Sequence, residues 1–317
     1  MLTEPNITRE RIQQIIEENW AFVIKNLEFN PGGQASWSYK VTDSNGNTYF
    51  FKIHQGAGDI LKRFDLTYKL FNLANIEQIA HPIKTKNEQL IVHLDSYPSA
   101  LFNFISGHNA SEKTLTNEQK MAVGELLGRI HKATDLVGGF PLKEDFIYQN
   151  LERLKQNILD GEKYLSDTSV YKKKGGELLL SHKHKILERS DALERLGQSL
   201  REREIPFVIC HGEPHLWNTM VDENGLVYLI DWDDSLLAPK EKDLMMIEDD
   251  QLKLQGYRNT VGEFSINSDV MQYYKWEWNI SEIDAWSDSI FTSTASATQN
   301  EAFVNFLSEV IEELKNS

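Results

Sequence analysis

Two polar residues that flank a predicted β-hairpin place the strongest limit on how this chain can fold. Asn218 and Asp231 enclose twelve residues whose apolar arms surround an Asn224-Gly225 pair, a strong signal for a tight turn. If that pair forms a two-residue loop, counting outward along both arms places Asn218 directly opposite Asp231. Cross-strand partners have Cβ atoms roughly 4.5–5.5 Å apart, so oxygens of both side chains could reach one Mg²⁺ ion. The spacing therefore predicts a hairpin that ends in a metal site.

A polar loop lies between an apolar run, Val208 to Cys210, and this hairpin. It contains Glu213, five positions before Asn218. The spacing is that of a kinase catalytic loop and metal-binding turn. It consists of a carboxylate (Glu213), an amide five positions later (Asn218) and a second carboxylate thirteen positions after the amide (Asp231). Each residue alone could cap an ordinary turn, but the joint spacing favours a site. We therefore predict Glu213 and Asn218 as catalytic residues, with Glu213 placed to orient or deprotonate an attacking hydroxyl.

Several motifs around this loop together resemble one enzyme family. The segment His211-Gly212-Glu213 with Asn218, the run Ile230-Asp231-Trp232 and the pair Asp243-Leu244 resemble the aminoglycoside phosphotransferase and choline kinase family, and the resemblance covers nearly the whole chain. It implies that Asn218 and Asp231 hold Mg²⁺ and that His211 and Asp243 brace the loop. The family usually has Asp where this chain has Glu213. The extra methylene moves the carboxylate by roughly 1.5 Å, a displacement that can matter in phosphoryl transfer.

The same resemblance implies a fold and an activity. The expected fold is α+β and protein-kinase-like, with a small antiparallel-sheet N-lobe over residues 1–105 that binds nucleotide and a larger, mainly helical C-lobe over residues 106–317 that carries catalysis and substrate binding. The expected reaction moves the γ-phosphate of ATP or GTP to a hydroxyl of a small cationic molecule, such as an aminoglycoside or aminocyclitol antibiotic like spectinomycin. A kinase for an amino alcohol or sugar, and a non-catalytic nucleotide-binding module, are the alternatives.

The periodicity of apolar residues agrees with a sheet-rich first half and a helical second half. Strands are expected where β-prone residues flank turn signals, including the Asn45-Gly46 pair, and helices where apolar residues recur every three to four positions. The predicted strands are 35–42, 48–53, 90–94 and 100–105, and the predicted helices are 8–18, 59–74, 117–132 and 181–201.

Lys52 lies in the second of these strands among residues that should be buried. A buried ammonium group needs an anionic partner, such as a nucleotide phosphate. In the family this lysine also pairs with an acid of the following helix. No Glu occurs between Lys52 and Ile76, which leaves Asp59 or Asp65 as the partner.

Further nucleotide contacts are expected in the first half of the chain. Gly33 and Gln34 follow Pro31-Gly32 and resemble the short turn that covers phosphates. The strand from Ala100 would be the hinge strand between the two lobes. Its backbone near Asn103 and Ile105 could bind the adenine or guanine base of the nucleotide. An ordinary turn and an ordinary strand would explain the same residues without a ligand.

Acceptor contacts are expected from acids near the metal turn and near the C-terminus. Asp233 follows Asp231 closely, and Glu277 and Asp284 lie among aromatic residues at helical spacing. By resemblance this later region lines the acceptor cleft, where carboxylates and aromatic rings suit a polyhydroxylated amine.

Composition excludes several other classes of protein. The formal net charge is −15, and a nucleic-acid binder needs a basic surface. No apolar run approaches the roughly 20 residues that span a bilayer, and no signal core begins the chain, so we expect a cytoplasmic protein without a membrane partner. Cys210 is the only cysteine, which fits a reducing compartment. Both a monomer and a homodimer are compatible with the sequence.

Overall fold

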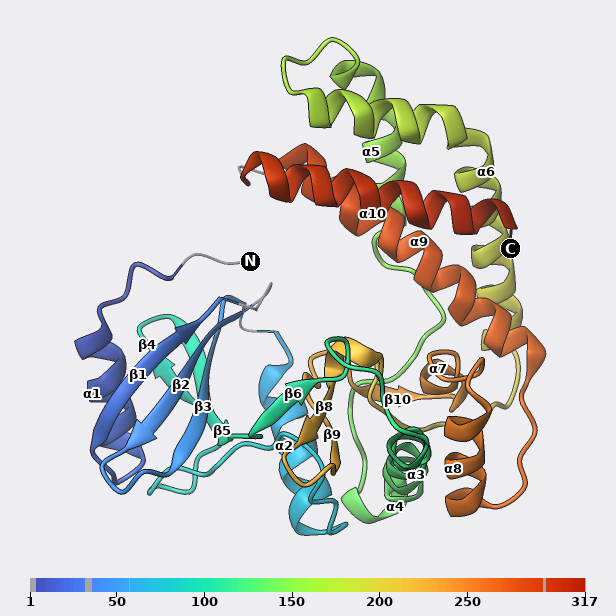
Figure 1. Cartoon of the computed structure of the whole chain (residues 1–317). Helices are drawn as coiled ribbons and strands as arrows, with labels where there is room; N and C mark the ends of the chain where they lie inside the picture. The colour runs from blue at the N-terminus through green and yellow to red at the C-terminus, as the bar shows by residue number, and fades with distance from the viewer. Residues whose placement is uncertain (1–3, 32–35, 57, 293–294, 317) are drawn as a thin grey trace. The chain divides into compact units, whose positions relative to one another are not determined.

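The computed structural model describes residues 4–31, 36–56, 58–292 and 295–316 (Figure 1). The chain forms two compact units. Unit 1 comprises residues 1–143 and 207–264, and unit 2 comprises residues 144–206 and 265–317. The predicted lobe boundary between residues 105 and 106 lies inside unit 1 and stays a prediction. Among the described residues, no helix has the length and apolar character needed to span a membrane.

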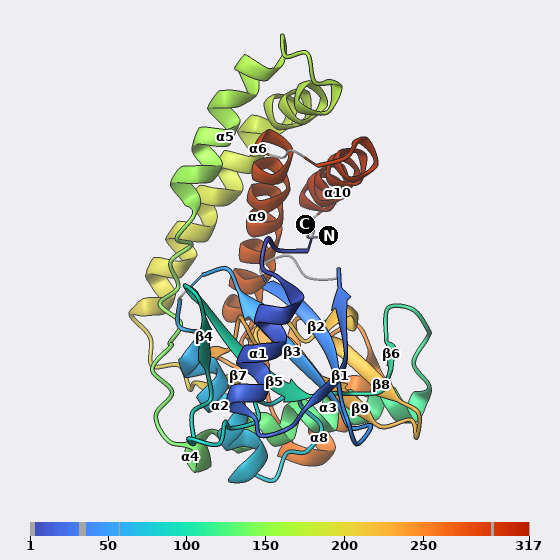
Figure 2. The ribbon, with the colours of Figure 1, turned by 90° about the vertical axis from the view of Figure 1, so that its left-hand side faces the viewer.

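Unit 1 begins with a five-stranded antiparallel sheet in the order β1-β2-β3-β5-β4. Helix α1 (Arg9–Asn19) starts at Thr8, whose side chain accepts from the Arg11 backbone N–H, and packs Ile12 and Ile16 onto the sheet (Figure 2). The strands are β1 (Ile24–Asn30), β2 (Ser36–Asp43), β3 (Thr48–His54), β4 (Val92–Leu94) and β5 (Tyr97–Asn103).

Helix α2 (Ile60–Asn72) packs on residues of this sheet through a separate apolar cluster. Its Ile60 and Phe64 contact Ala100 and Phe102 of β5. The remaining strands of unit 1 form two small sheets, β6-β8-β9 and β10-β7. These strands are β6 (Gly107–Asn109), β7 (Val208–Cys210), β8 (Thr219–Asp222), β9 (Val227–Leu229) and β10 (Leu236–Ala238).

Two helices of unit 1 approach each other unusually closely. Helices α3 (Asn117–Lys132) and α8 (Gln251–Val261) lie side by side (Figures 1 and 2). A Cβ added to Gly124 would overlap the Lys253 carbonyl oxygen, and one added to Gly256 would overlap the Met121 carbonyl oxygen. Only glycine allows this backbone contact. Two short helices, α4 (Thr134–Val137) and α7 (Glu241–Leu244), and a 3₁₀ helix, η1 (Leu216–Asn218), complete the unit.

Unit 2 consists of long helices that pack on one another. Its helices are α5 (Leu151–Tyr164), α6 (Val170–Arg201), α9 (Ser268–Thr292) and α10 (Ala297–Asn316). Asp284 of α9 is fully buried, and its carboxylate accepts hydrogen bonds from Arg153 of α5 and from the Tyr148 hydroxyl. This buried network ties α9 to α5 and to the segment that precedes it.

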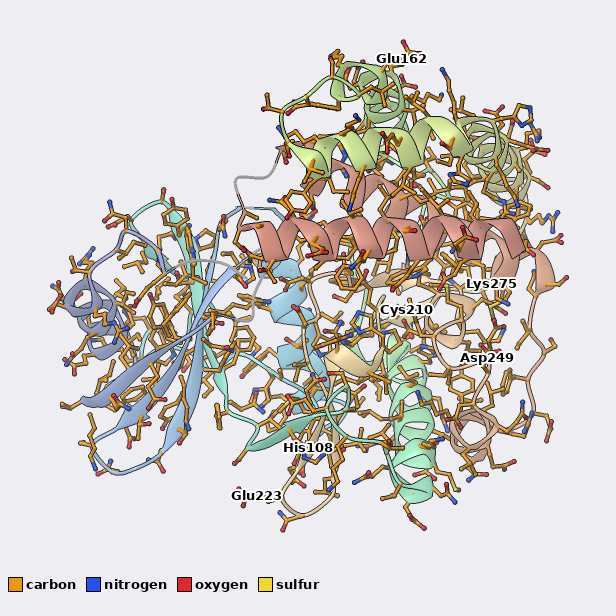
Figure 3. The ribbon with its side chains drawn as sticks, turned by 45° about the horizontal axis from the view of Figure 1, so that its top comes forward. His108, Glu162, Cys210, Glu223, Asp249 and Lys275 are labelled. Atoms are coloured by element: carbon orange, nitrogen blue, oxygen red, sulfur yellow. The ribbon has the colours of Figure 1, made fainter. Side chains whose placement is uncertain are left out.

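The predicted register of the β8-β9 hairpin is wrong by one residue. Thr219 pairs with Leu229, so Asn218 stands opposite Ile230 rather than Asp231. The loop holds three residues instead of two, with Glu223 at its tip (Figure 3) and Gly225 at φ 83°. Asp222 Oδ1 accepts from the backbone N–H groups of residues 224 and 226, which stabilises the wider turn.

Candidate active site

Lys52 connects the five-stranded sheet to the metal-binding turn predicted from the sequence. Its Nζ lies 2.8 Å from Asp231 Oδ1 and 2.9 Å from Asp233 Oδ2, and its side chain is only 13% exposed. Burial alone would lower the pKa of Lys52, but Asp231 and Asp233 outweigh it and raise the pKa. The ammonium group is therefore charged and held between two carboxylates.

The expected partner of Lys52 on the following helix is wrong in this structure. Asp59 pairs with Lys62 at 2.6 Å, and Asp65 pairs with Lys69 at 2.7 Å. Both are local pairs, between residues three or four positions apart, at the start of α2 and within it. The carboxylates that bind Lys52 come instead from the segment after β9, 179 and 181 positions later in the chain.

Backbone geometry sets the position of Asp231 beside Asn218. The Ile230 backbone N–H donates to the Asn218 carbonyl oxygen at 2.9 Å, and Asp231 then turns into the left-handed region at φ 59°. The Asn218 side-chain amide donates to the Glu213 carbonyl oxygen at 3.0 Å, which leaves its side-chain oxygen as an acceptor. One hairpin end thus brings together the two predicted metal ligands and the predicted catalytic loop, although not through the predicted register.

A buried carboxylate holds the predicted catalytic loop in place. Asp243 accepts from the backbone N–H groups of His211 and Gly212, each at 2.9 Å, and contacts His131 Nε2 at 3.0 Å. Burial would raise the pKa of Asp243, but the bond from His131 and the neighbouring charges lower it overall. His211 in turn contacts the Ile230 carbonyl oxygen at 2.9 Å. These contacts agree with the bracing roles that the sequence resemblance implies.

His131 carries no motif signal in the sequence, yet it belongs to this bracing group. It lies in the last turn of α3, where a basic residue is common for reasons of helix polarity alone. Its Nδ1 lies 2.8 Å from the Tyr257 hydroxyl of α8, so the helix pair reaches the loop through this ring.

Glu213 lines a cavity of about 430 Å³ within unit 1. The carboxylate lies 3.7 Å from His215 Nε2. Burial lowers the pKa of His215, so its ring is mainly neutral near pH 7. The cavity walls come from α2, from the segment before unit 2, and from residues around β10: Arg63, Pro141, Leu142, Lys143, Glu213, Asp234, Leu236 and Lys242.

Of the other predicted nucleotide contacts, the structure describes Asn103 and Ile105 only. Gly33 and Gln34 lie outside the described residues. Asn103 uses its side chain to fix a neighbouring segment, because its Oδ1 accepts from the His81 N–H and its Nδ2 donates to the Ile79 carbonyl oxygen. Ile105 is partly buried just after β5. A contact of either residue with a base stays a prediction.

The predicted acceptor contacts belong to different units of the chain. Asp233 binds Lys52 and is 28% exposed. Glu277 and Asp284 lie on α9 in unit 2, and the Asp284 carboxylate is already bound by Arg153 and Tyr148. Their contact with an acceptor stays a prediction.

The buried His54 makes folding stability depend on pH. Burial and the nearby Lys52 lower the pKa of His54 to about 4, below its ordinary value of 6.5. As pH falls below 6.5 the His54 side chain of the unfolded chain binds a proton that the folded chain does not, so the contribution of His54 to the free energy of unfolding should drop by about 3 kcal/mol by pH 4. Denaturant unfolding of His54→Gln, with the exposed His93→Gln as control, checks this. An unchanged pH slope in His54→Gln would contradict it.

Comparisons with known proteins agree with this arrangement. A family model described as the phosphotransferase enzyme family matches residues 26–252. A structure of spectinomycin phosphotransferase with ADP and spectinomycin is similar at a TM-score of 0.77 and 20% identity, covering 98% of each chain. An amicoumacin kinase bound to AMP-PNP and Ca²⁺ is similar at 0.67 and 16% identity, covering 97% of this chain and 94% of that one. A microcompartment-associated aminopropanol kinase gives 0.66 and 13% identity, covering 96% of each.

These likenesses confirm the predicted fold class, a small antiparallel sheet followed by a mainly helical part as in kinase-like phosphotransferases. A search of curated protein sequences gave no significant match.

Proposed function

This chain belongs to the phosphotransferase enzyme family and is a small-molecule kinase, and from that premise we propose that it transfers the γ-phosphate of ATP or GTP to a hydroxyl of a small cationic acceptor. One observation carries the proposal. Lys52, a cation from the sheet, meets Asp231 at 2.8 Å beside the loop that bears Glu213 and Asn218. A phosphate-binding cation, metal-ligand oxygens and a base in one place are the parts that phosphoryl transfer requires.

Each residue has a distinct role in the proposal. Lys52 binds the donor phosphates and neutralises their charge, which requires it to give up part of its present pairing with Asp231. Glu213 accepts a hydrogen bond from the acceptor hydroxyl, orients its oxygen toward the phosphorus and takes its proton as the new bond forms. Asp243 keeps the backbone of residues 211 and 212 fixed, so the carboxylate of Glu213 does not drift from the acceptor.

The residues present fit a magnesium ion. Asp231 offers a carboxylate and Asn218 an amide oxygen, which are the hard donors that Mg²⁺ prefers, and Asp231 already attracts a cation in the form of Lys52. Burial would raise the pKa of Asp231, but Lys52 lowers it overall, so the side chain is a ready anionic ligand. When bound, the ion would neutralise charge on the phosphates during transfer. This fit supports Asn218 and Asp231 as the metal ligands.

The acceptor is proposed from the resemblance and from charge. Spectinomycin or another aminocyclitol is the first candidate, because a structure that resembles this chain over its whole length binds spectinomycin. The net charge of −15 favours the approach of a cation. Resistance to such an antibiotic would be the cellular role. A metabolite with an amine and a hydroxyl is the second candidate, since an aminopropanol kinase is also similar.

A panel of acceptors with ATP and with GTP tests the proposal. Nucleotide consumption and phosphorylated product, measured by mass spectrometry, should appear with at least one hydroxyl compound. The non-catalytic alternative predicts nucleotide binding, seen as a thermal shift, with no product from any acceptor.

Replacing Lys52 with methionine should weaken nucleotide binding or transfer while the protein stays folded. The change removes the cation that meets the phosphates and keeps an apolar side chain of similar length. Thermal unfolding with and without Mg²⁺-nucleotide should show a smaller stabilisation in Lys52→Met. Lys25→Met, on an exposed position of β1, is the matched control. If the nucleotide-induced shift and the turnover both stay unchanged, Lys52 has only a structural role.

A further inference from the structure

The cavity beside Glu213 is more basic than the rest of the protein. Three cationic side chains and two carboxylates line it, whereas the whole chain has 33 Lys and Arg against 48 Asp and Glu. The cations come from separate segments, since Arg63 lies on α2, Lys143 lies before unit 2 and Lys242 lies on α7. The fold therefore gathers positive charge from three segments next to a predicted catalytic carboxylate.

Arg63 lines the cavity and also carries one buried donor without a partner. Within the described part of the chain, its Nε is buried and has no hydrogen-bond partner. The neighbouring lysines of α2 are paired differently, Lys62 with Asp59 and Lys69 with Asp65. A buried donor without a partner is costly and calls for an explanation. Arg63 also lines the cavity, and a guanidinium group can bind a carboxylate or phosphate through two parallel hydrogen bonds, so an anionic ligand in the cavity suits this side chain.

The cavity's second carboxylate does not remove this need. Asp234 is exposed to solvent yet surrounded on one side by protein atoms, and that desolvation raises its pKa, with Arg63 opposing and Asp233 and Asp231 adding to the rise. Asp234 is one carboxylate facing three cationic side chains in the cavity lining, Arg63, Lys143 and Lys242. It is also placed to accept a hydrogen bond from an amine in the same cavity.

We propose that the acceptor carries an anionic group, a carboxylate or a phosphate, which binds at Arg63 while the acceptor hydroxyl lies at Glu213. The inference rests on the proposed phosphotransfer and replaces the cationic acceptor of that proposal with a zwitterionic or anionic one. The volume of about 430 Å³ suits a small metabolite. A polycationic acceptor would instead meet three like charges in this cavity, Arg63, Lys143 and Lys242, against the two carboxylates of Glu213 and Asp234.

The first test measures anion binding without any turnover. Sulfate is titrated into the complex of the protein with Mg²⁺ and saturating AMP-PNP, so that the nucleotide occupies the phosphate-binding residues. Sulfate should raise the midpoint of thermal unfolding of the wild type and of the control Lys62→Met, and Arg63→Met should lose most of this rise. Arg63→Lys keeps the positive charge but loses the two parallel N–H donors of the guanidinium group, so the sulfate-induced rise in its unfolding midpoint should be intermediate. An equal rise in all four proteins would overturn the proposal.

The second test compares acceptors that differ only in the anionic group. The pairs are threonine with 1-aminopropan-2-ol, and glycerol 3-phosphate with glycerol, and spectinomycin represents the cationic class. We expect kcat/KM to be at least about tenfold higher for the anionic member of one pair, which also tells a carboxylate from a phosphate. Arg63→Met should lower that value by roughly tenfold or more and change the uncharged or cationic partner little.

The outcomes separate this inference from the proposed function. Turnover of spectinomycin or of the amino alcohol, with none for the anionic compounds, would overturn the anionic acceptor and leave phosphotransfer standing. An equal loss for both members of a pair in Arg63→Met would also overturn it, because Arg63 would then act on the phosphoryl group or on folding. Binding of nucleotide and of Arg63-dependent sulfate, without phosphorylation of any acceptor, would instead contradict the kinase proposal.

Discussion

Replacing Glu213 with alanine is expected to lower kcat by roughly 10²-fold or more while nucleotide affinity changes little. Glu213 follows the two backbone N–H groups that Asp243 holds, and its side chain lines the cavity proposed for the acceptor. In phosphoryl transfer the protein mainly positions groups and balances charge, so a carboxylate can serve whether Asp or Glu carries it, provided its oxygen reaches the hydroxyl. Steady-state kinetics and nucleotide titration of Glu213→Ala measure the two effects separately.

Two further variants sharpen this experiment. Glu223→Ala removes an exposed carboxylate at the tip of the β8-β9 hairpin, which accepts a hydrogen bond from Ser106, and should keep wild-type turnover. Glu213→Asp should retain activity only if the loop can bring the shorter side chain closer to the acceptor. Turnover of Glu213→Ala at the wild-type rate would mean that another acid does this work. Asp234, which lines the same cavity, would then be the first to test.

The second large effect is expected at Asp231. Asp231→Asn should raise the Mg²⁺ concentration needed for half-maximal activity, or lower turnover at saturating Mg²⁺, by at least about tenfold. The substitution removes one charge and keeps the backbone, because asparagine tolerates the left-handed conformation that Asp231 adopts at φ 59°. Initial rates measured across a Mg²⁺ titration give both quantities.

Asp233→Asn is the matched control for this change. Asp233 also pairs with Lys52, at 2.9 Å, so its loss disturbs the same ammonium group without removing a proposed metal ligand. We expect Asp233→Asn to affect nucleotide affinity while the Mg²⁺ dependence stays that of the wild type. Identical Mg²⁺ titrations for Asp231→Asn and the wild type would remove Asp231 from the metal site.

Local sequence signals predict the helices and strands around this site well, but they predict the pairing register of the strands less well. The helix expected over residues 117–132 coincides with α3, and the Asn45-Gly46 turn does join β2 and β3. The Asn224-Gly225 pair predicts a turn but does not state whether the loop holds two or three residues. That choice depends on the Asp222 side chain, which accepts two backbone N–H groups across the loop. One extra loop residue shifts every partner in the hairpin.

Contacts between distant segments are beyond the reach of such signals. The partners of Lys52 lie about 180 positions away, at 179 and 181, and nothing near Lys52 in the sequence points to them. In the sequence, Arg63 is one of several charged residues on an amphipathic helix. Only the folded structure shows that it lines a cavity and that its Nε is buried. Periodicity decides which face of α2 is buried, whereas tertiary structure decides which polar residue at the edge of that face meets a ligand.

The glycine contact between α3 and α8 should make the proposed catalytic loop sensitive to mutations that lie well away from it. Gly124 and Gly256 let the two backbones touch, and each helix then contributes one member of the pair His131 and Tyr257. His131 contacts Asp243, which accepts a hydrogen bond from the backbone N–H of His211 in the loop. A methyl group added at either glycine must push the helices apart, and the displacement would pass along this chain of contacts to Glu213. Inactive variants selected at random should therefore include substitutions at Gly124 or Gly256 that leave every proposed catalytic and ligand-binding residue unchanged.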